Sequence, residues 1–344
     1  MFKDLSLTIS IAFLLTLSII VLYSVAHLLF PSYFIYLILA IVVFWFFSQI
    51  GFDITSLFSI HFYVISILLL LLTLIIGRIT NNTIRWIPIG SFTLQPSEVV
   101  RPLLLVYFAN YLTTGKLDSL KLIKGLLLLI LPVGLILIQP SLSVSILTLV
   151  GFVGILIASN FDKKYLLFGV GVVIILIPIF WQIMAPYQRA RLKSFLNPTS
   201  DPLGAGYNSI QSVIAAGAGE WSGRGLGRGI QTQLSFLPEK QTDFIFAAVS
   251  EELGFVGSML MLSATFVILF RLTKFMENSV NPAGRAYLSG FFLTYLLQIF
   301  IHTGMNMGIL PVTGLPFPLV SAGGSSLLAT MMGLGIAVSA YKKS

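Results

Sequence analysis

Long runs of apolar residues, separated by short polar stretches, extend from one end of the chain to the other. A helix needs about 20 mostly apolar residues to cross the hydrocarbon core of a bilayer. Each run of roughly that length therefore predicts a transmembrane helix. About ten such runs occur, at 5–29, 32–50, 57–77, 97–113, 125–138, 142–160, 165–184, 246–271, 285–308 and 322–341.

This pattern predicts an all-α integral membrane protein, a polytopic bundle of about ten transmembrane helices that uses residues 1–344 as a single domain. Only 9% of the residues are charged and 57% are hydrophobic, whereas a soluble domain carries about 25% charge. So little charge leaves too little polar surface for water, and lipid must be the main solvent. The absence of cysteine excludes disulfides, thiol catalysis and cysteine-ligated zinc.

Two of the runs allow a second interpretation. The run at 5–29 follows Lys3 as a secretory signal would, but it is longer than the roughly 7–15 apolar residues of a signal peptide, so we interpret it as the first transmembrane helix. The run at 125–138 is short and meets the next run at 139–141. Those two are either separate spans or one broken, re-entrant pair, which is tolerated only where the freed backbone faces protein or a watery cavity.

The basic residues gather in alternate loops, and cytoplasmic loops are the ones enriched in Lys and Arg. With the N-terminus inside, the short outside loops hold only Arg78 and Arg85. We therefore expect both termini to be cytoplasmic. The net charge of +8 is then an orientation signal, and no nucleic-acid partner is predicted. The inside carries Lys3, Lys116, Lys121, Lys124, Lys163, Lys164, Arg271, Lys274, Arg285, Lys342 and Lys343.

Two predicted outside segments are unusually polar, 78–97 and the large extracytoplasmic loop 185–245. A loop as long as the second is more often functional than a plain connector. The apolar residues Ile210, Val213 and Ile214 have helical spacing, which predicts a helix inside the loop. The stretch 186–196 mixes basic and apolar residues and predicts an interfacial helix that attracts anionic membrane lipids.

The outer entry of the eighth span carries the densest candidate chemistry, with Glu239, Lys240 and Asp243 close together. Either Thr242 or Asp243 caps the helix, or Asp243 is a catalytic base, and the residues alone leave both open. About two turns further in lie two adjacent acids, at 251 and 252. Charges inside a span are costly, so they serve either a cavity and its substrate or buried structural hydrogen bonds.

Glu98 and Arg101 lie three residues apart, on one face of the fourth span. Pro96 marks the helix start, where its missing N–H is best tolerated. An ion pair would satisfy two charges that lipid does not accept. The pair is either a structural link between helices, or a cavity feature in which Arg101 helps to hold phosphate.

A glycine-rich stretch at 217–229 includes Arg224 and Arg228. Its backbone N–H groups could form an anion-binding nest, or the stretch could be a flexible loop. It follows no predicted strand and lacks the Walker spacing, so nucleotide binding is unsupported.

Several motifs, in order along the chain from about residue 85, together resemble the SEDS family of bacterial cell-wall proteins, named for shape, elongation, division and sporulation and typified by RodA and FtsW. The matching pieces are Arg85-Trp86-Ile-Pro-Ile-Gly90, Gln95-Pro-Ser-Glu98, Gln139-Pro140-Ser141-Leu142, Gly204-Ala-Gly-Tyr207, Leu237-Pro-Glu239, Thr242-Asp243-Phe-Ile-Phe246, Glu251-Glu-Leu-Gly254, Pro316-Phe-Pro-Leu-Val-Ser321 and Gly323-Gly-Ser-Ser326.

The resemblance implies a peptidoglycan glycosyltransferase of the bacterial cytoplasmic membrane. Such proteins polymerise lipid II at the outer face, with a class B penicillin-binding protein as transpeptidase partner. The family's proposed catalytic aspartate falls on Asp243, its cavity acid on Glu98 and a nearby lysine on Arg101. Ser141 stands where the family often has aspartate, and Ala322 where it usually has tyrosine.

The residues suit that chemistry. A sugar hydroxyl must attack the anomeric carbon of a second lipid-linked unit, and one carboxylate can take the proton. The leaving diphosphate needs positive charge or a divalent cation, Mg²⁺ or Mn²⁺, although the sequence shows no metal ligands. We predict Asp243 as the catalytic residue. The predicted substrate-binding residues are Glu98, Arg101, Arg85, Lys240, Glu239, Arg224 and Arg228.

Two rival functions stay open. A lipid-linked oligosaccharide flippase would need polar residues through the membrane depth, whereas the charges here gather at the outer side. An ion-coupled transporter would use Glu98, Glu251 and broken helices as its binding site, usually within a repeated architecture. No internal repeat is visible in the chain.

Overall fold

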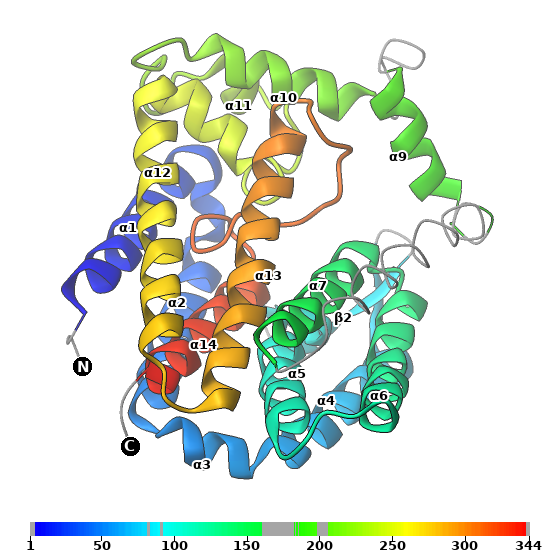
Figure 1. Ribbon diagram of the computed structural model, residues 1–344. Coiled ribbons are helices and arrows are strands. Elements are labelled where there is room, and N and C mark those ends of the chain that lie inside the picture. Colours follow the sequence, from blue (N-terminus) through cyan, green and yellow to red (C-terminus); the bar gives the residue numbers. More distant parts are fainter. Residues whose placement is uncertain are drawn as a thin grey trace.

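The computed structural model describes residues 4–80, 83–89, 92–159, 182, 184, 186–197 and 206–341, and most of these lie in helices (Figure 1). The predicted all-α class is confirmed. The helices are α1 (Leu5–Ala26), the 3₁₀ turn η1 (His27–Leu29), α2 (Phe30–Gln49), α3 (Phe52–Leu57), α4 (Ser59–Ile76), α5 (Pro96–Thr113), α6 (Ser119–Ile138), α7 (Leu142–Ala158), α9 (Pro186–Leu196), α10 (Tyr207–Ala218), α11 (Ile230–Gln233), α12 (Ile245–Asn278), α13 (Pro282–Asn306) and α14 (Gly324–Tyr341).

Most predicted spans coincide with these helices, and the span at 165–184 lies outside the described residues. Within the described part, six helical stretches are long and apolar enough to cross a membrane, and the first of them, Leu5–Gln49, covers two predicted spans. Large apolar side chains such as Ile38 and Phe266 are exposed along the bundle, as contact with lipid requires. The protein is a multi-pass membrane protein.

The short fifth run is a longer helix than the pattern predicts. α6 begins at Ser119, capped by the carboxylate of Asp118, which accepts a hydrogen bond from Lys121 N at 2.8 Å. The apolar pattern missed this start because the first turn contains lysine and serine. With 20 residues, α6 can cross a bilayer alone, which favours two separate spans over a re-entrant pair.

The polar segment at 78–97 contains an antiparallel sheet that the apolar pattern did not predict. Its three strands are β1 (Arg78–Thr80), β2 (Thr83–Ile89) and β3 (Phe92–Leu94), in the order β1-β2-β3. Isoleucine and threonine dominate the three strands, and such β-branched residues suit a pleated surface. The sheet brings Arg85 and Trp86 to the start of α5.

Small residues let the central helices pack closely. α13 packs against α5, α7 and α12, and α14 packs against α2 and α5. Where α7 meets α13, a Cβ on Gly154 would lie 2.8 Å from the Cα of Gly290. Such backbone contact is the usual packing mode of helices in lipid. Helices α7 and α13 are thereby in direct backbone contact.

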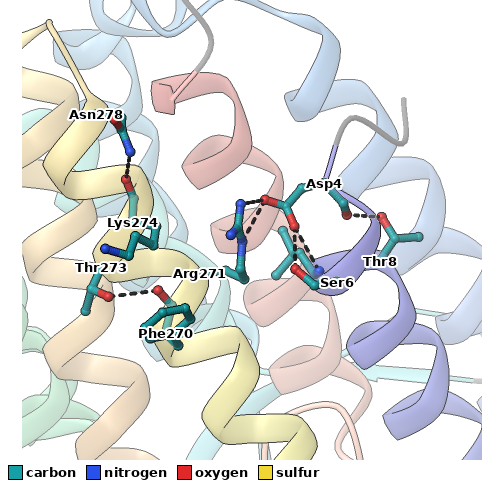
Figure 2. Close-up of polar contacts among 9 residues, drawn as sticks. Asp4, Ser6, Thr8, Phe270, Arg271, Thr273, Lys274 and Asn278 are labelled. Atoms are coloured by element: carbon teal, nitrogen blue, oxygen red, sulfur yellow. Dashed lines mark hydrogen bonds and ion pairs between the residues drawn. The ribbon is translucent and has the colours of Figure 1, made fainter.

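Both chain ends contact the same part of α12. Asp4 caps α1 by accepting from Leu7 N at 3.1 Å, and it pairs with Arg271 through both Nε and Nη2 (Figure 2). The ring of Tyr341 stacks on Phe275, with the centroids 4.5 Å apart. The first and last described helices therefore reach one end of the bundle.

The predicted extracytoplasmic loop 185–245 is well structured where it is described. α9 coincides with the predicted helix at 186–196, and α10 carries Ile210, Val213 and Ile214, as their spacing predicts. Figure 1 shows α9, α10 and α11 gathered at the end of the bundle away from the termini. The contact of α9 with anionic lipid stays a prediction.

Candidate functional site

A cavity of about 740 Å³ lies at the end of the bundle opposite the chain termini. Its walls come from β2, the starts of α5, α7 and α14, helix α9, the turn at 239–244 and the loop at 311–316. Because helix direction alternates through the bundle, these segments all belong to the side that the loop charges predict to be outside. The motifs at 95–98, 139–142 and 323–326 meet there.

Asp243 lies on a tight turn at 239–244, directly before α12. The carbonyl of Glu239 accepts from Thr242 N at 3.1 Å and from Phe244 N at 3.2 Å. Glu239 adopts a left-handed φ of 50°, which is uncommon for a residue with a side chain. The turn is therefore fixed in a backbone conformation that is strained at Glu239.

The prediction that Thr242 or Asp243 caps α12 is wrong. The capping residue is Phe244, with no side-chain hydrogen bond to the helix, and the Thr242 hydroxyl bonds instead to the Glu239 carboxylate at 3.0 Å. The Asp243 side chain lines the cavity. Of the two interpretations that the sequence left open, the structure favours a carboxylate available for chemistry.

The surroundings of Asp243 make it a stronger base than an ordinary aspartate. Burial raises the pKa of Asp243 to about 6, the nearby Glu239 carboxylate adds to the rise, and Arg191 and Arg85 oppose it. Gly314, with φ 73°, lies next to both Asp243 and Arg191. A Cβ on Gly314 would lie 3.4 Å from Asp243 Oδ2 and 3.9 Å from Arg191 Nη1. At neutral pH the carboxylate is mostly deprotonated, so it can accept a proton.

Glu98 and Arg101 form the ion pair that their spacing predicts, with Nη1 and Oε2 3.3 Å apart. Both are buried, with 3% and 5% of their surface exposed. Glu98 lines the cavity, but Arg101 lies beneath it and donates from Nη2 to Gln298 Oε1 at 3.1 Å. Gln298 in turn donates to Pro316 O at 2.9 Å. The predicted position of Arg101 inside a phosphate-binding cavity is therefore not what the structure shows.

Three other predicted substrate-binding residues lie outside the cavity lining. Lys240 donates to the carbonyl of Thr232. Burial lowers the pKa of Lys240 despite two acids on α12. Arg224 donates to Ala218 O at 3.1 Å, and Arg228 is exposed. Lys240 is three residues from Asp243 in the chain, but its ammonium group is bound at Thr232 O, outside the cavity lining.

The acids at the start of α12 hold the long loop in place. Glu251 accepts from Gln231 N at 2.8 Å and from Thr232 N at 2.9 Å. Glu252 accepts from Ser24 Oγ at 2.7 Å. Both acids are fully buried. The structure thus favours buried structural hydrogen bonds over a role in binding substrate.

The glycine-rich stretch packs its backbone against α12. Arg224 N donates to Glu251 O at 2.9 Å and Gly225 N to Glu252 O at 3.0 Å. A Cβ on Gly223, where φ is 79°, would lie 2.2 Å from Glu252 O. Because these N–H groups are already used, neither the anion nest nor the flexible loop fits the structure, and close packing explains the glycines.

The sequence did not identify Arg191 as a site residue. It lies on α9 and donates to Val312 O at 3.3 Å, which places it across Gly314 from Asp243. About fifty residues separate Arg191 from Asp243 in the chain, and no local pattern reports such a distant contact. The sequence Pro311-Val-Thr-Gly314 is a turn signal. It could have indicated the loop that contains Gly314 and contacts Arg191.

Two of the three departures from the family pattern, Ser141 and Ala322, have different positions. Ser141 lines the cavity, whereas Ala322 does not. Within the described residues, no group of three or more His, Asp or Glu side chains is arranged to hold a metal ion. A requirement for Mg²⁺ or Mn²⁺ stays a prediction.

Comparison with known proteins places these features in a family. The family model for cell cycle proteins of the FtsW, RodA and SpoVE type matches residues 1–344. Peptidoglycan glycosyltransferase MrdB of Escherichia coli strain K12 is 36% identical over 287 residues, covering 82% of this chain and 77% of MrdB. Probable peptidoglycan glycosyltransferase FtsW of Acinetobacter baylyi is 35% identical over 291 residues, covering 82% and 72%.

Solved structures agree. A chain of a peptidoglycan synthase complex, solved to show the structural coordination of polymerization and crosslinking, matches with a TM-score of 0.86 and 28% identity, covering 99% of this chain and 98% of that one. The rod shape determining protein RodA of Thermus thermophilus matches with a TM-score of 0.74 and 25% identity, covering 99% and 97%.

Proposed function

This chain belongs to the FtsW, RodA and SpoVE family of cell cycle proteins, and we propose that it is a peptidoglycan glycosyltransferase that polymerises lipid II at the outer face of the bacterial cytoplasmic membrane. One observation carries the proposal. A carboxylate of raised pKa, Asp243, lines a cavity where two arginines act on it. This combination suits transfer of a sugar away from a diphosphate.

The reaction joins two lipid-linked sugars. The hydroxyl oxygen of one unit forms a bond to the anomeric carbon of the other, and the bond from that carbon to the diphosphate breaks. Asp243 takes the hydroxyl proton as general base. Arg85 and Arg191 stabilise the negative charge that develops on the diphosphate. No second carboxylic acid is needed, because a lipid diphosphate is already a good leaving group.

The rival functions fit the structure less well. A flippase needs a polar path through the membrane, but the described cavity lies at one end of the bundle. An ion-coupled transporter would use Glu251, yet that carboxylate is occupied by two backbone N–H groups. Glu98 is paired with Arg101. Of the two acids that the transporter hypothesis names, Glu251 is therefore hydrogen-bonded to backbone and Glu98 is ion-paired.

The function is tested with the purified protein, fluorescent lipid II and a gel that separates glycan chains. We expect polymer, and more of it when a cognate class B penicillin-binding protein is reconstituted in the same bilayer. Equal yields with and without that partner would show that the chain acts alone. A chelator in a parallel reaction tests the Mg²⁺ or Mn²⁺ requirement. Absence of polymer under every condition, with lipid II moved across vesicle membranes, would favour the flippase.

The proposed active site requires the cavity to face outward, with both termini in the cytoplasm. Because the chain lacks cysteine, single introduced cysteines report orientation cleanly. Ser222 is exposed on the cavity side, and Ser119 is exposed at the opposite end. We expect Ser222→Cys to react with a membrane-impermeant maleimide in intact cells, and Ser119→Cys to react only after permeabilisation. The reverse pattern would overturn the orientation.

A further inference from the structure

The turn at 239–244 is held by residues that precede α14. Its carbonyl at Gln241 accepts from Ala322 N at 2.8 Å, and its carbonyl at Thr242 accepts from Ser321 Oγ at 2.7 Å. These bonds fix the path of the backbone up to Asp243. They leave the next carbonyl, that of Asp243, and the N–H of Ala247 in the first turn of α12 to another partner.

That partner is Asn306, the last residue of α13. Its Nδ2 donates to Asp243 O at 3.0 Å and to His302 O at 2.8 Å. Its Oδ1 accepts from Ala247 N, in the first turn of α12, at 3.0 Å. The side chain is fully buried, and its own carbonyl accepts from Ser212 Oγ at 2.9 Å. One amide therefore binds both sides of the junction between the turn and α12.

The partners of Asn306 fix the orientation of its amide. If the amide were flipped, Nδ2 would face the N–H of Ala247 and Oδ1 would face two carbonyl oxygens, so no hydrogen bond would form. In the observed orientation both donors and the acceptor are used. A buried amide that satisfies three backbone groups at once is rigid.

A helix start leaves several backbone N–H groups without partners, and aspartate is one of the residues that usually satisfies them from its own side chain. At α12 the side chain of Asn306 satisfies one of them, the N–H of Ala247, from another helix, and the Asp243 carboxylate lines the cavity. We propose that Asn306 is a positioning residue for Asp243, which keeps the carboxylate off the N-terminus of α12; this rests on the proposed function. It touches neither substrate nor reacting atoms.

Removal of the Asn306 amide leaves Ala247 N without a partner. Asp243 directly precedes the capping residue Phe244, so we expect its carboxylate to turn toward the helix start and take over this N–H. A carboxylate that accepts backbone N–H groups has a lower pKa than one in a cavity. The charged groups that face or share the cavity with Asp243 stay unchanged in such a variant, and they are Glu239, Arg191, Arg85 and Glu98.

The test measures the pKa of Asp243 directly, in the full chain in detergent. A carbodiimide reacts with the protonated carboxyl, so the rate of labelling at Asp243, followed by peptide mass spectrometry across pH 4–8, gives a midpoint. We expect a wild-type midpoint near pH 6 and a fall of about one pH unit in Asn306→Ala. The matched control is Asn110→Ala, which also removes two bonds between segments, to Ser56 O and Ser59 Oγ, but far from the cavity, and its midpoint should match wild type.

Activity gives the second readout. We expect Asn306→Ala to lower kcat for lipid II polymerisation by roughly 10- to 100-fold, with little change in KM. If Asn306→Ala does not fold, Asn306→Gln keeps a buried amide that is one carbon longer, and the same direction of shift is expected. The proposal would be overturned by a folded variant in which both the labelling midpoint of Asp243 and the fall of kcat/KM at low pH match wild type. The midpoint does not depend on catalysis. A shifted midpoint therefore supports the positioning role even if the chain proves not to polymerise lipid II, a failure that the wild-type gel assay reveals separately.

Discussion

Replacement of Asp243 by asparagine is expected to lower the rate of lipid II polymerisation by about 10²- to 10⁴-fold, the usual contribution of general-base catalysis. Asparagine keeps the shape of the side chain and removes its basicity. Folding should change little, because the carboxylate makes no capping hydrogen bond to α12. Binding of lipid II should persist. The measurement is the initial rate of well-folded Asp243→Asn beside wild type in the same detergent.

A matched control is Asp118→Asn, an aspartate that does cap a helix, by accepting from Lys121 N at 2.8 Å, at the other end of the molecule. Asparagine caps almost as well, so this variant should keep the wild-type rate. If Asp243→Asn also kept it, the catalytic assignment would be wrong, and Glu98 would be the next candidate.

The same base predicts the pH dependence of the wild-type enzyme. Because burial raises the pKa of Asp243 to about 6, the carboxylate is protonated below that pH and deprotonated above it. Only the deprotonated form accepts a proton, so kcat/KM should fall as the pH drops below about 6 and level off above it. The acid limb should be absent from the residual activity of Asp243→Asn.

The second large effect concerns the buried pair. Substitution of either Glu98→Gln or Arg101→Gln is expected to lower the free energy of unfolding by about 3–5 kcal/mol, because one charge is left without its partner in a buried site. The double variant should lose much less than the sum of the two. The measurement is a double-mutant cycle, in which thermal unfolding of wild type, the two single variants and the double variant is compared in one detergent. Additive losses would mean that the two residues are not coupled.

The chain contains its own control for this cycle. Lys274 and Glu277 are also three residues apart and form a 2.8 Å pair, but 43% and 61% of their side chains are exposed. Exposed pairs contribute little, so their coupling should stay within about 0.5 kcal/mol. A further variant, Arg101→Lys, introduces the residue that the family resemblance implies. Lysine can pair with Glu98, but it lacks the planar fork that also reaches Gln298, so an intermediate loss is expected.

Most of the helices could be predicted because a helix that crosses a lipid bilayer must be built from apolar residues. A span must be apolar over its whole length, so α1, α4 and α12 appear directly in the apolar pattern. The start of α6 was missed, since its first turn lies in the polar loop. The sheet at 78–94 was missed because its short strands contain polar residues and were interpreted as a loop.

Contacts between site residues could be predicted only where both residues share one segment. Glu98 and Arg101 are one helical turn apart, so their pairing follows from spacing, and Asp243 was identified through a local motif. Arg191 and Asn306 act on Asp243 from distant parts of the chain, and no local pattern contains that information. Lys240 is the converse case: it is three residues from Asp243 in the chain, yet it lies outside the cavity lining.

The hydrogen bond from Ala322 to the turn explains how this position can vary without loss of geometry. Its donor is a main-chain N–H, which nineteen of the twenty amino acids possess. Exchange of tyrosine for alanine there leaves the bond intact. Proline alone lacks the donor. At position 322 the turn therefore depends on the backbone donor and not on the side chain.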